Sequence, residues 1–367
     1  MKVYMQYPLG ISDSQYYKSM IDNPPKDVQY INPIKGDGVI NNEKQFLILN
    51  YLKKKVRTWT NRLGLVIPNA HTSPKGDYDL IQCAHCLSKN NSPYVIDVES
   101  MWQLWISGRD KERGIKKVAK YLENENCKKI IAWTEKTKQD IIKKFPKVED
   151  KIEVVSYAMK APQQSKKKKT KDITLFFSGR HFYSKGGLHA VEAMDRLTKM
   201  YPNIKGVING VIPKEIEEKY SSNKKLKFYG LMPHADVLEL YKAADIFVYP
   251  GYSDSFGFVF VEAMAYGLPI VTVAGCARKE IVGVSGFILD RPPKLDIKTI
   301  NTLPGEFIIC DIVHATSVLI DNTFIRKNMS DQGKLKVIDG KFSIQNRNDK
   351  LSKIYKDALN LNTRLDY

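Results

Sequence analysis

Two carboxylates, Asp254 and Glu262, lie on either side of the start of a predicted helix. Apolar side chains recur at helical spacing from Phe256 to Tyr266, after a short aromatic-rich strand. The first turn of a helix has backbone N–H groups without an intrahelical acceptor, and Gly257 would let a ligand approach that backbone closely. This combination suits the binding of a phosphate or another anionic oxygen.

Residue types also mark both ends of this helix. Ser253 or Ser255 can cap its start, and Gly267 stands where a left-handed residue commonly ends a helix. Pro269 prevents the helix from continuing. An ordinary strand–helix–strand crossover with a solvated Glu262 is the alternative interpretation of this stretch.

The sixteen residues 254–269 read DSFGFVFVEAMAYGLP. They resemble the signature of the retaining glycosyltransferases of family 4, in which an acidic pair E-x7-E lies within E-G-F-G-x4-E-A-M-A-x-G-x-P. Asp254 stands where the family has its first Glu, and Glu262 matches the second. The resemblance implies an α/β protein of GT-B fold, with two Rossmann-like domains facing each other across a cleft. It also implies transfer of a sugar from a nucleoside-diphosphate sugar to an acceptor hydroxyl, with retention of configuration.

A second stretch, FFSGRHFYSKGG over 176–187, resembles the family's G-R-x4-K-G segment. By this resemblance Gly179 ends a strand, and Arg180 and Lys185 hold the donor diphosphate. Negative charge grows on the leaving nucleoside diphosphate as the sugar departs, and two fixed cations can stabilise it without a metal. Two surface cations on a strand–helix turn are the alternative.

The resemblance assigns the rest of the donor site residue by residue. Glu262 would accept hydrogen bonds from the ribose hydroxyls, and Asp254 would lie near the transferred sugar. The base, whether uracil, guanine or adenine, would rest on a strand end, and a UDP- or GDP-sugar is the expected donor. Beyond the four charged residues, the expected donor-binding positions are Gly10, Gly179, Gly230, Leu231, Ser255, Phe256, Gly257 and Phe258.

The acceptor side carries weaker signals. Family members often have a histidine after the strand that matches PYVIDVE, and this chain has Glu99 there. His85, at the end of the preceding predicted strand, could substitute, or could be a packed or solvent-facing histidine. Trp102 and Trp105 could line an acceptor cleft or pack in the core.

Metal and nucleotide-hydrolysis signatures are missing from the sequence. Cys83, His85 and Cys86 are close in sequence, but strand geometry predicts that Cys83 and His85 share a face that Cys86 does not. No second Cys/His pair stands at zinc-finger spacing. There is no G-x-x-x-x-G-K-[ST] loop and no G-x-G-x-x-G, so ATPase and dinucleotide-dependent functions lack their motifs. We expect no metal and no cofactor.

The 367 residues are enough for two domains. Alternating strand and helix patterns predict one α/β domain over 1–160 and another over 172–342. The resemblance implies that the first is the acceptor-side Rossmann-like domain and the second the nucleotide-sugar-binding one. The lysine-rich segment 161–171 reads as a linker between them. The resemblance implies that a helix over 343–360 packs back on the first domain. The stretch Arg291–Cys310 fits no element.

Composition bounds the compartment. With 43% hydrophobic and 27% charged residues the chain has a globular composition, and no apolar run approaches the length of a membrane span. The N-terminus has no signal-peptide core. Five scattered cysteines indicate no disulfide framework, so we expect a cytoplasmic protein.

The formal charge of +18 is uneven along the chain. Residues 1–170 hold 31 Lys and Arg against 18 Asp and Glu, and so most of the excess. Such an excess suits an anionic partner, and the predicted helix Gln45–Leu63, with its basic residues Lys53–Lys55 and Arg57, could dock on anionic lipids. A solvated basic face is the alternative.

Other function classes remain open at this point. The charge and the lysine tract also suit a nucleic-acid-binding protein, which the paired motifs would leave unexplained. The replacements at Asp254 and Glu99 are compatible with a relative that isomerises or phosphorolyses sugars, or with a non-catalytic homologue. A glycan or a lipid-linked acceptor, with peripheral contact to the cytoplasmic membrane face, is the expectation that combines the motifs with the charge.

Overall fold

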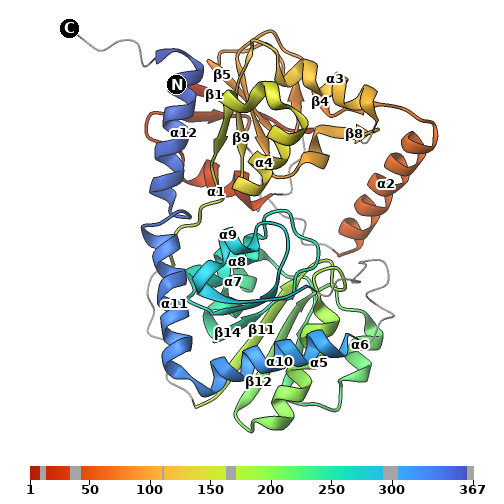
Figure 1. Cartoon of the computed structure of the whole chain (residues 1–367), viewed down its shortest axis with the longest axis vertical. Helices are drawn as coiled ribbons and strands as arrows, with labels where there is room; N and C mark the ends of the chain where they lie inside the picture. The colour runs from red at the N-terminus through yellow and green to blue at the C-terminus, as the bar shows by residue number, and fades with distance from the viewer. Residues whose placement is uncertain (9–13, 34–42, 110, 163–170, 292–304, 362–367) are drawn as a thin grey trace. The chain divides into compact units, whose positions relative to one another are not determined.

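The computed structural model describes the chain except residues 9–13, 34–42, 110, 163–170, 292–304 and 362–367. It divides into two compact units, each with its own parallel sheet. The first unit comprises Met1–Ile40, Lys44–Ala158 and Ile344–Tyr367, and the second comprises Asn41–Glu43 and Met159–Ser343. Both have helices packed around a central sheet (Figure 1).

The sheet of the first unit has six parallel strands in the order β10-β9-β7-β5-β1-β2. Every residue of its middle strands, LIQCA and YVIDV, is buried, which is typical of a parallel sheet covered on both faces. The strands are β1 (Lys2–Gln6), β2 (Gln29–Ile31), β5 (Leu80–Ala84), β7 (Tyr94–Val98), β9 (Cys127–Ala132) and β10 (Ile152–Val154).

The helices of the first unit are α1 (Gln15–Asp22), α2 (Glu43–Arg62), α3 (Glu112–Leu122), α4 (Glu135–Lys144) and α12 (Ile344–Ala358). Two short 3-10 helices, η2 (Met101–Leu104) and η3 (Pro146–Lys151), lie in its connections. Two small two-stranded sheets, β3 (Ile67–Pro68) with β8 (Trp105–Ser107) and β4 (Ala70–His71) with β6 (Leu87–Ser88), complete it.

The last helix, α12, packs against the first unit through buried polar contacts. Arg347 is 1% exposed and donates to Ser19 Oγ at 2.9 Å and to the Asn23 carbonyl at 2.5 Å. The Tyr355 hydroxyl donates to Gln82 Oε1 in β5. The chain thus returns, after the whole second unit, to complete the first.

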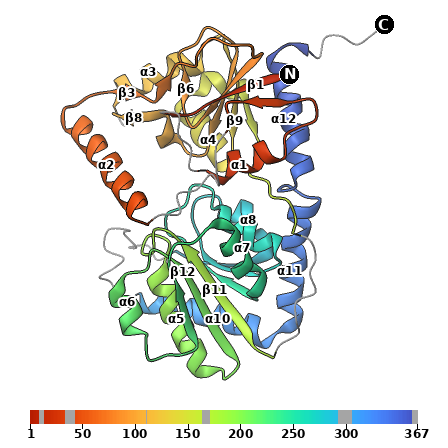
Figure 2. The same cartoon turned by 180° about the vertical axis from the view of Figure 1, so that it is seen from behind.

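Helix α2 stands apart from the sheet of its unit in both views (Figures 1 and 2). Its C-terminal end is attached, because Thr60 is buried and Asn61 Oδ1 accepts from the Gly108 amide at 3.2 Å. Most of the remaining described side chains of the helix are exposed, apolar and basic ones alike.

The second unit also has six parallel strands, in the order β13-β12-β11-β14-β15-β16. The order reverses between β11 and β14, and open α/β sheets bind ligands at such a switch point. The strands are β11 (Ile173–Gly179), β12 (Ile204–Gly210), β13 (Leu226–Tyr229), β14 (Ile246–Val248), β15 (Ile270–Val273) and β16 (Gly286–Leu289).

The helices of the second unit are α5 (Gly187–Met200), α6 (Lys214–Lys219), α7 (His234–Ala243), α8 (Phe258–Ala265), α9 (Arg278–Ile281), α10 (Glu306–Asp321) and α11 (Thr323–Ile338), with a 3-10 turn η4 (Gly283–Ser285). Helix α10 begins inside the stretch 291–310 that the sequence left unassigned. Its residues Ile308, Ile309 and Ile312 are buried, so packing stabilises a helix where β-branched residues weaken the local signal.

The cap predicted for α8 is wrong. Neither Ser253 nor Ser255 caps the helix; its N-cap is Gly257, at φ +89°, with no side-chain cap hydrogen bond. A left-handed backbone is natural for glycine, and an added Cβ would lie 2.7 Å from the Phe260 ring. The predicted C-terminal end is correct, because Gly267 has φ +71° and donates to the Met264 carbonyl.

Across the described residues no single helix is long and apolar enough to cross a membrane, although α10 and α11, bent by 98°, pass that length and composition test as a pair.

Candidate functional site

The charged residues that the motifs singled out lie at the carboxyl ends of the strands beside the switch point of the second unit. Gly179 is the last residue of β11, and Arg180 follows it directly. Lys185 lies in the loop that leads into α5, and Asp254 lies in the loop between β14 and α8. The topology therefore brings together two motifs that are about seventy residues apart in the sequence.

Lys185 and Asp254 form an ion pair at the centre of this site. The Lys185 ammonium donates to Asp254 Oδ1 and to the Ser253 carbonyl, each at 2.5 Å. The two side chains are 18% and 10% exposed, so the pair is largely shielded while the ammonium retains some access to solvent. An incoming anion would find a cation whose present partners are one carboxylate and one carbonyl.

A close backbone contact fixes the Lys185 loop against the end of β14. The Gly251 amide donates to the Lys185 carbonyl at 2.9 Å. Gly186 has φ +80°, and a Cβ there would lie 2.5 Å from Pro250. The loops that carry Lys185 and Asp254 are thus held together at Gly186, where a residue with a side chain would clash with Pro250.

Glu262 is buried inside α8 and is paired. It is 5% exposed, and its Oε1 lies 2.8 Å from Nε2 of His234, the first residue of α7. The alternative of a solvated Glu262 is therefore wrong. His234 was not anticipated from the sequence, and its only signal was a histidine shortly after the strand end at Gly230–Leu231.

The strand end predicted to receive the base is open and fixed from below. Gly230 is exposed, and a Cβ on it would meet no described atom within 4 Å. Asn209 Nδ2 donates to the Gly230 carbonyl at 2.7 Å, and Ser178 Oγ donates to Asn209 Oδ1 at 3.0 Å. Leu231, next in the chain, is half-buried.

The other predicted positions separate into accessible and buried ones. Arg180, Ser255 and Phe258 are half-buried, whereas Phe256 is 1% exposed and packs against Phe258 and Phe342. Phe256 can therefore offer a ligand only its backbone. Gly10 lies outside the described residues.

Two further residues reach Asp254 that the sequence did not point to. The Tyr249 hydroxyl donates to Asp254 Oδ1 at 3.3 Å, and burial raises the pKa of Tyr249 well above its usual value. Arg278 Nη2 lies 3.6 Å from Asp254 Oδ2. Arg278 follows β15, on the far side of the signature helix in sequence, and its position in the sequence gives no hint of the contact.

The carboxyl ends of the first unit's strands hold a different cluster. His85, at φ +57°, lies with its ring among Tyr17 and Trp133, and its Nε2 is 3.7 Å from Glu99 Oε2. Burial lowers the pKa of His85 to about 3, so the imidazole is neutral at ordinary pH. Trp105 is a core residue that donates to the Gly114 carbonyl, whereas Trp102 is 42% exposed.

The expected separation of Cys86 from Cys83 is wrong. Strand β5 ends at Ala84, and the left-handed backbone of His85 turns the chain back. Both thiols consequently lie beside Gln6, whose Nε2 is 3.6 Å from Cys83 Sγ and 3.5 Å from Cys86 Sγ. Within the described residues, no group of three His, Cys, Asp or Glu side chains could hold a metal ion.

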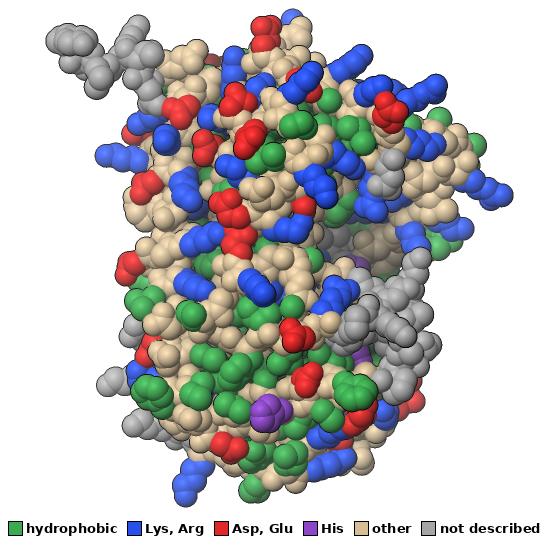
Figure 3. All heavy atoms as spheres, viewed as in Figure 1, with side chains coloured by type: hydrophobic (Ala, Val, Ile, Leu, Met, Phe, Trp, Pro, Cys, Tyr) green, Lys and Arg blue, Asp and Glu red, His purple; other side chains and the backbone are tan. Residues whose placement is uncertain are grey.

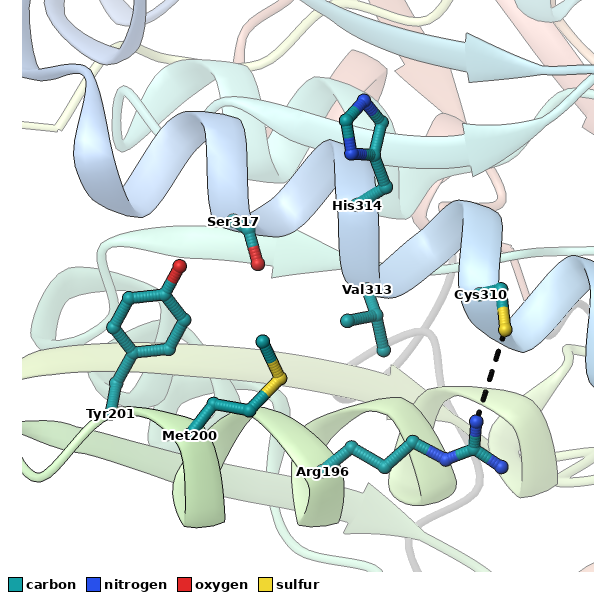
Figure 4. A pocket seen from close by; sticks show the side chains of 7 residues that line it. All are labelled: Arg196, Met200, Tyr201, Cys310, Val313, His314 and Ser317. Carbon is teal, nitrogen blue, oxygen red and sulfur yellow. Dashed lines mark hydrogen bonds between the residues drawn. The ribbon is translucent and has the colours of Figure 1, made fainter.

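A hollow of about 450 Å³ in the second unit lies away from this chemistry (Figure 4). It is formed by the end of α5 and one side of α10, and contains none of the predicted site residues. It is lined by Arg196, Met200, Tyr201, Cys310, Val313, His314 and Ser317.

The match to a known family covers the charged site. Residues 159–300 match the family model described as Glycosyl transferases group 1. The chain is 28% identical over 142 residues to a phosphatidylinositol N-acetylglucosaminyltransferase subunit of Arabidopsis thaliana, covering 36% of this chain and 32% of the relative. It is 28% identical over 192 residues to the glycogen synthase of Mycobacterium tuberculosis, covering 50% and 46%. The chain thus spans between about a third and a half of the length of these relatives.

Among solved structures, HepE of Anabaena in complex with UDP matches with a TM-score of 0.61 and 15% identity, over 97% of this chain and 100% of that chain. At this identity the likeness establishes the fold alone. The fold is the GT-B fold of glycosyltransferases, built from two Rossmann-like units, as the sequence predicted. Arg180, Lys185, Asp254 and Glu262 all lie within the residues that match the family model.

Proposed function

We propose that this chain is a retaining glycosyltransferase that moves a sugar from a nucleoside-diphosphate sugar to an acceptor hydroxyl without a metal ion. The observation that carries the proposal is the Lys185–Asp254 ion pair, 2.5 Å long, at the switch point of the sheet that matches the group 1 family. The pair brings a cation and a carboxylate side by side, as a site for a diphosphate and a sugar would require.

Arg180 and Lys185 bind the diphosphate in this proposal. The Lys185 ammonium gives up part of its contact with Asp254 and Ser253 in favour of phosphate oxygens, where charge grows as the sugar departs. The Glu262 carboxylate, kept in place by His234, accepts hydrogen bonds from the ribose hydroxyls. The base rests on the strand end at Gly230.

The reaction breaks the bond between the anomeric carbon and the phosphate oxygen. The acceptor oxygen attacks the face from which the diphosphate departs, and its proton passes to the departing phosphate oxygen. A double displacement through Asp254 is disfavoured, because both carboxylate oxygens already lie near cations that reduce their nucleophilicity. Because the acceptor attacks the face from which the diphosphate departs, the configuration at the anomeric carbon is retained.

A UDP- or GDP-sugar is the donor that we propose. HepE, which shares the fold, was solved with UDP. The open backbone at Gly230 would accept a pyrimidine or a purine, since no described side chain lies within 4 Å of a Cβ position there.

We further propose that the acceptor is lipid-linked or a glycan at an anionic membrane surface, and that α2 makes the contact. Its exposed apolar side chains include Ile48 (59%), Leu52 (52%) and Trp59 (63%), and Lys53, Lys54 and Lys55 lie among them. A helix with apolar and basic side chains suits the boundary between headgroups and acyl chains. One relative's name, a phosphatidylinositol N-acetylglucosaminyltransferase subunit, describes a lipid acceptor for that protein.

A cytoplasmic location, peripheral to the membrane, is part of the same proposal. All five cysteines are unpaired thiols: Cys83, Cys86 and Cys127 are buried, and Cys276 and Cys310 are exposed. Exposed free thiols suit a reducing compartment.

The test is a panel of UDP-, GDP- and ADP-sugars, with release of the nucleoside diphosphate as the readout and NMR of the product to assign the anomer. We expect one nucleotide series to be turned over, with an α-linked donor giving an α-linked product. Lys199, 70% exposed on α5 and paired with Asp195, provides a matched control, because Lys199→Ala removes a cation outside the site. An inverted anomer, or donor consumption that yields only a rearranged or phosphorylated sugar, would contradict retaining transfer.

A further inference from the structure

Arg278, the first residue of α9, is a buried cation that binds no part of the donor in the proposed function. It is 1% exposed, and its guanidinium lies next to Asp254, with Nη2 3.6 Å from Oδ2. Among the described residues, neither Nε, Nη1 nor Nη2 has a hydrogen-bond partner, and the same holds for Asp254 Oδ2. Burying a guanidinium without hydrogen bonds costs several kcal/mol, so its retention calls for a reason.

The surrounding backbone is shaped to admit this side chain. Gly251 has φ +63°, and a Cβ there would lie 3.0 Å from Arg278 Nη2. Gly275 has φ +146°, and a Cβ there would lie 2.9 Å from Arg278 Nη1. The Phe260 ring, in the signature helix, lies 5.9 Å from the guanidinium carbon and offers its π face to the cation. Two glycines and one ring thus enclose a single charge.

Asp254 therefore has two cations, and they differ in freedom. Lys185 reaches Oδ1 at 2.5 Å from the open side and is 18% exposed. Arg278 approaches Oδ2 from the closed side, and none of its nitrogens is accessible to solvent. An incoming anion can attract the Lys185 ammonium but cannot reach the Arg278 guanidinium.

We propose that Arg278 is a positioning residue that acts through Asp254. It holds the carboxylate from behind and remains its counter-ion when the donor diphosphate takes the Lys185 ammonium. Asp254 consequently stays oriented beside the sugar at the step in which the Lys185 ammonium turns to the phosphate. The inference rests on the proposed role of Lys185 in binding the diphosphate.

This role also gives a physical account of the aspartate at position 254. A carboxylate one methylene shorter than the family's glutamate lies closer to its own backbone. The sealed guanidinium and the Tyr249 hydroxyl, 3.3 Å from Oδ1, fix it there. Asp254 is shorter than the family's glutamate, but Arg278 and Tyr249 hold its carboxylate in one orientation.

The test is a double-mutant cycle between Arg278→Met and Asp254→Asn, read on turnover and on the affinity for UDP measured by calorimetry. With Asp254 present, we expect Arg278→Met to lower kcat about thirtyfold and the UDP affinity by less than about threefold. Arg278→Lys should recover about tenfold of that loss. In the Asp254→Asn background the same substitution should change kcat by less than about threefold. An equal loss in both backgrounds, or a loss of UDP affinity that parallels kcat, would overturn the proposal.

A second measurement does not depend on catalysis. The coupling between Arg278 and Asp254 in the thermal midpoint should be larger with UDP bound than without it, because Lys185 then contributes less to Asp254. If UDP binds and the coupling does not change, the positioning role fails whether or not sugar transfer is found. If the coupling rises but no donor is turned over, the proposed function fails and the positioning role stands.

Arg278→Met removes a buried side chain, so a variant that keeps the charge accompanies it. Gly275→Ala would press on Nη1, and it would also strain the backbone, since Gly275 has φ +146°. We expect a loss of kcat of about tenfold with UDP affinity retained. Turnover within about twofold of the wild type in both Gly275→Ala and a folded Arg278→Met would overturn the proposal.

Discussion

The strand ends of the two sheets carry different chemistry on closely related frameworks. In the second unit the ends beside the switch point hold Asp254 between two cations, Lys185 at 2.5 Å and Arg278 at 3.6 Å. In the first unit they hold His85, a neutral imidazole whose ring lies against that of Tyr17 from α1. In the proposed function, one architecture would thus bind a charged leaving group with one sheet and uncharged hydroxyl groups with the other.

Most of the excess positive charge of the chain does not lie in the unit whose strand ends are charged. Residues 1–170 carry most of the +18, but the described strand ends of the first unit hold no cluster of cations. Figure 3 shows Lys and Arg side chains spread over the visible face rather than gathered in one patch. The excess charge of the first unit is thus not gathered at its strand ends, whereas the second unit has cations in contact with a carboxylate at its strand ends.

The largest effect is expected from the charged strand ends. Arg180→Ala and Lys185→Ala should each lower turnover about a hundredfold, equivalent to roughly 2.7 kcal/mol of barrier. Thermal midpoints should change little, because both side chains are partly accessible. The Lys199→Ala control should retain turnover. Near-normal transfer by the double variant would remove the diphosphate assignment.

The next effect tests whether the first unit's strand ends are neutral. Burial raises the pKa of Asp97, in β7, to about 7, and the hydrogen bond that Gln82 Nε2 donates to Asp97 Oδ2 at 2.6 Å opposes that rise. The folded chain then holds a proton that the unfolded chain releases near pH 4. Between about pH 5 and 7 the unfolded state binds fewer protons, so the free energy of unfolding should fall with rising pH by on the order of 2 kcal/mol.

Asp97→Asn should abolish this slope in urea titrations at about pH 5, 6, 7 and 8. Above about pH 7 the wild-type curve should flatten, because both states have then lost the proton. Arg347 in α12 and Tyr16 in α1 also act on this cluster electrostatically and are left intact. Asp150→Asn, an exposed change in η3, is the matched control. A wild-type slope that persists in Asp97→Asn would mean that Asp97 is ionised in the fold.

A smaller effect, about 1 kcal/mol for each cation near an anionic surface at low salt, is expected at α2. The wild type should sediment with anionic but not with neutral liposomes, less so as salt rises. Replacing Lys53, Lys54, Lys55 and Arg57 with Glu should abolish this and leave donor hydrolysis intact. Arg57 already lies over the Trp102 ring at 5.2 Å, so it should contribute least of the four.

Two controls sharpen the assignment of α2. Glu at Lys116, Lys120, Lys143 and Lys147, on α3, α4 and η3, changes the charge equally at another surface and should preserve binding. Leu52→Ser with Trp59→Ser removes apolar area alone and should weaken binding to the same vesicles. A wild type that ignores anionic liposomes at low salt would assign the charge to solvation or to another polyanion.

No effect at all is expected from EDTA. In the proposed mechanism, Lys185 and Arg180 supply the positive charge that a bridging divalent ion would otherwise bring to the diphosphate. Turnover in EDTA should equal that in Mg²⁺ or Mn²⁺. A loss in EDTA that either ion restores would place a metal at the diphosphate and contradict the proposed mechanism.

The elements that the sequence predicts best are those with strong periodicity and clear ends. Both six-stranded sheets consist of short apolar runs, and the signature helix ends at Gly267 as its sequence indicates. The two-residue strands of the small sheets are too short to show a period. The beginning of α10 was missed because EFIIC has strand propensity, and only burial against its own unit makes it helical.

The site divides in the same way. Arg180, Lys185, Asp254 and Glu262 stand in motifs whose spacing is local, so their types and positions could be predicted. Arg278 and His234 reach the same carboxylates from other loops, and no period or spacing connects them with their partners. Cys86 is a case in which the strand was predicted correctly but the direction of a side chain was not. The left-handed backbone of His85 ends the strand's alternation, so Cys86 lies on the same side as Cys83.

Because α12 belongs to the first unit, that unit cannot complete its fold until the C-terminal part of the chain has been synthesised. About 185 residues separate Ala158 from Ile344, and at roughly 5–20 residues per second their synthesis takes about ten to forty seconds. Until then the first half of the chain lacks Arg347 and Tyr355, and Ser19 and Gln82 have no helix to bind. The half that leaves the ribosome first is therefore the last to be completed. A cut before α12 would remove the hydrogen bonds that Arg347 and Tyr355 donate to Ser19 and Gln82, near the other end of the sequence.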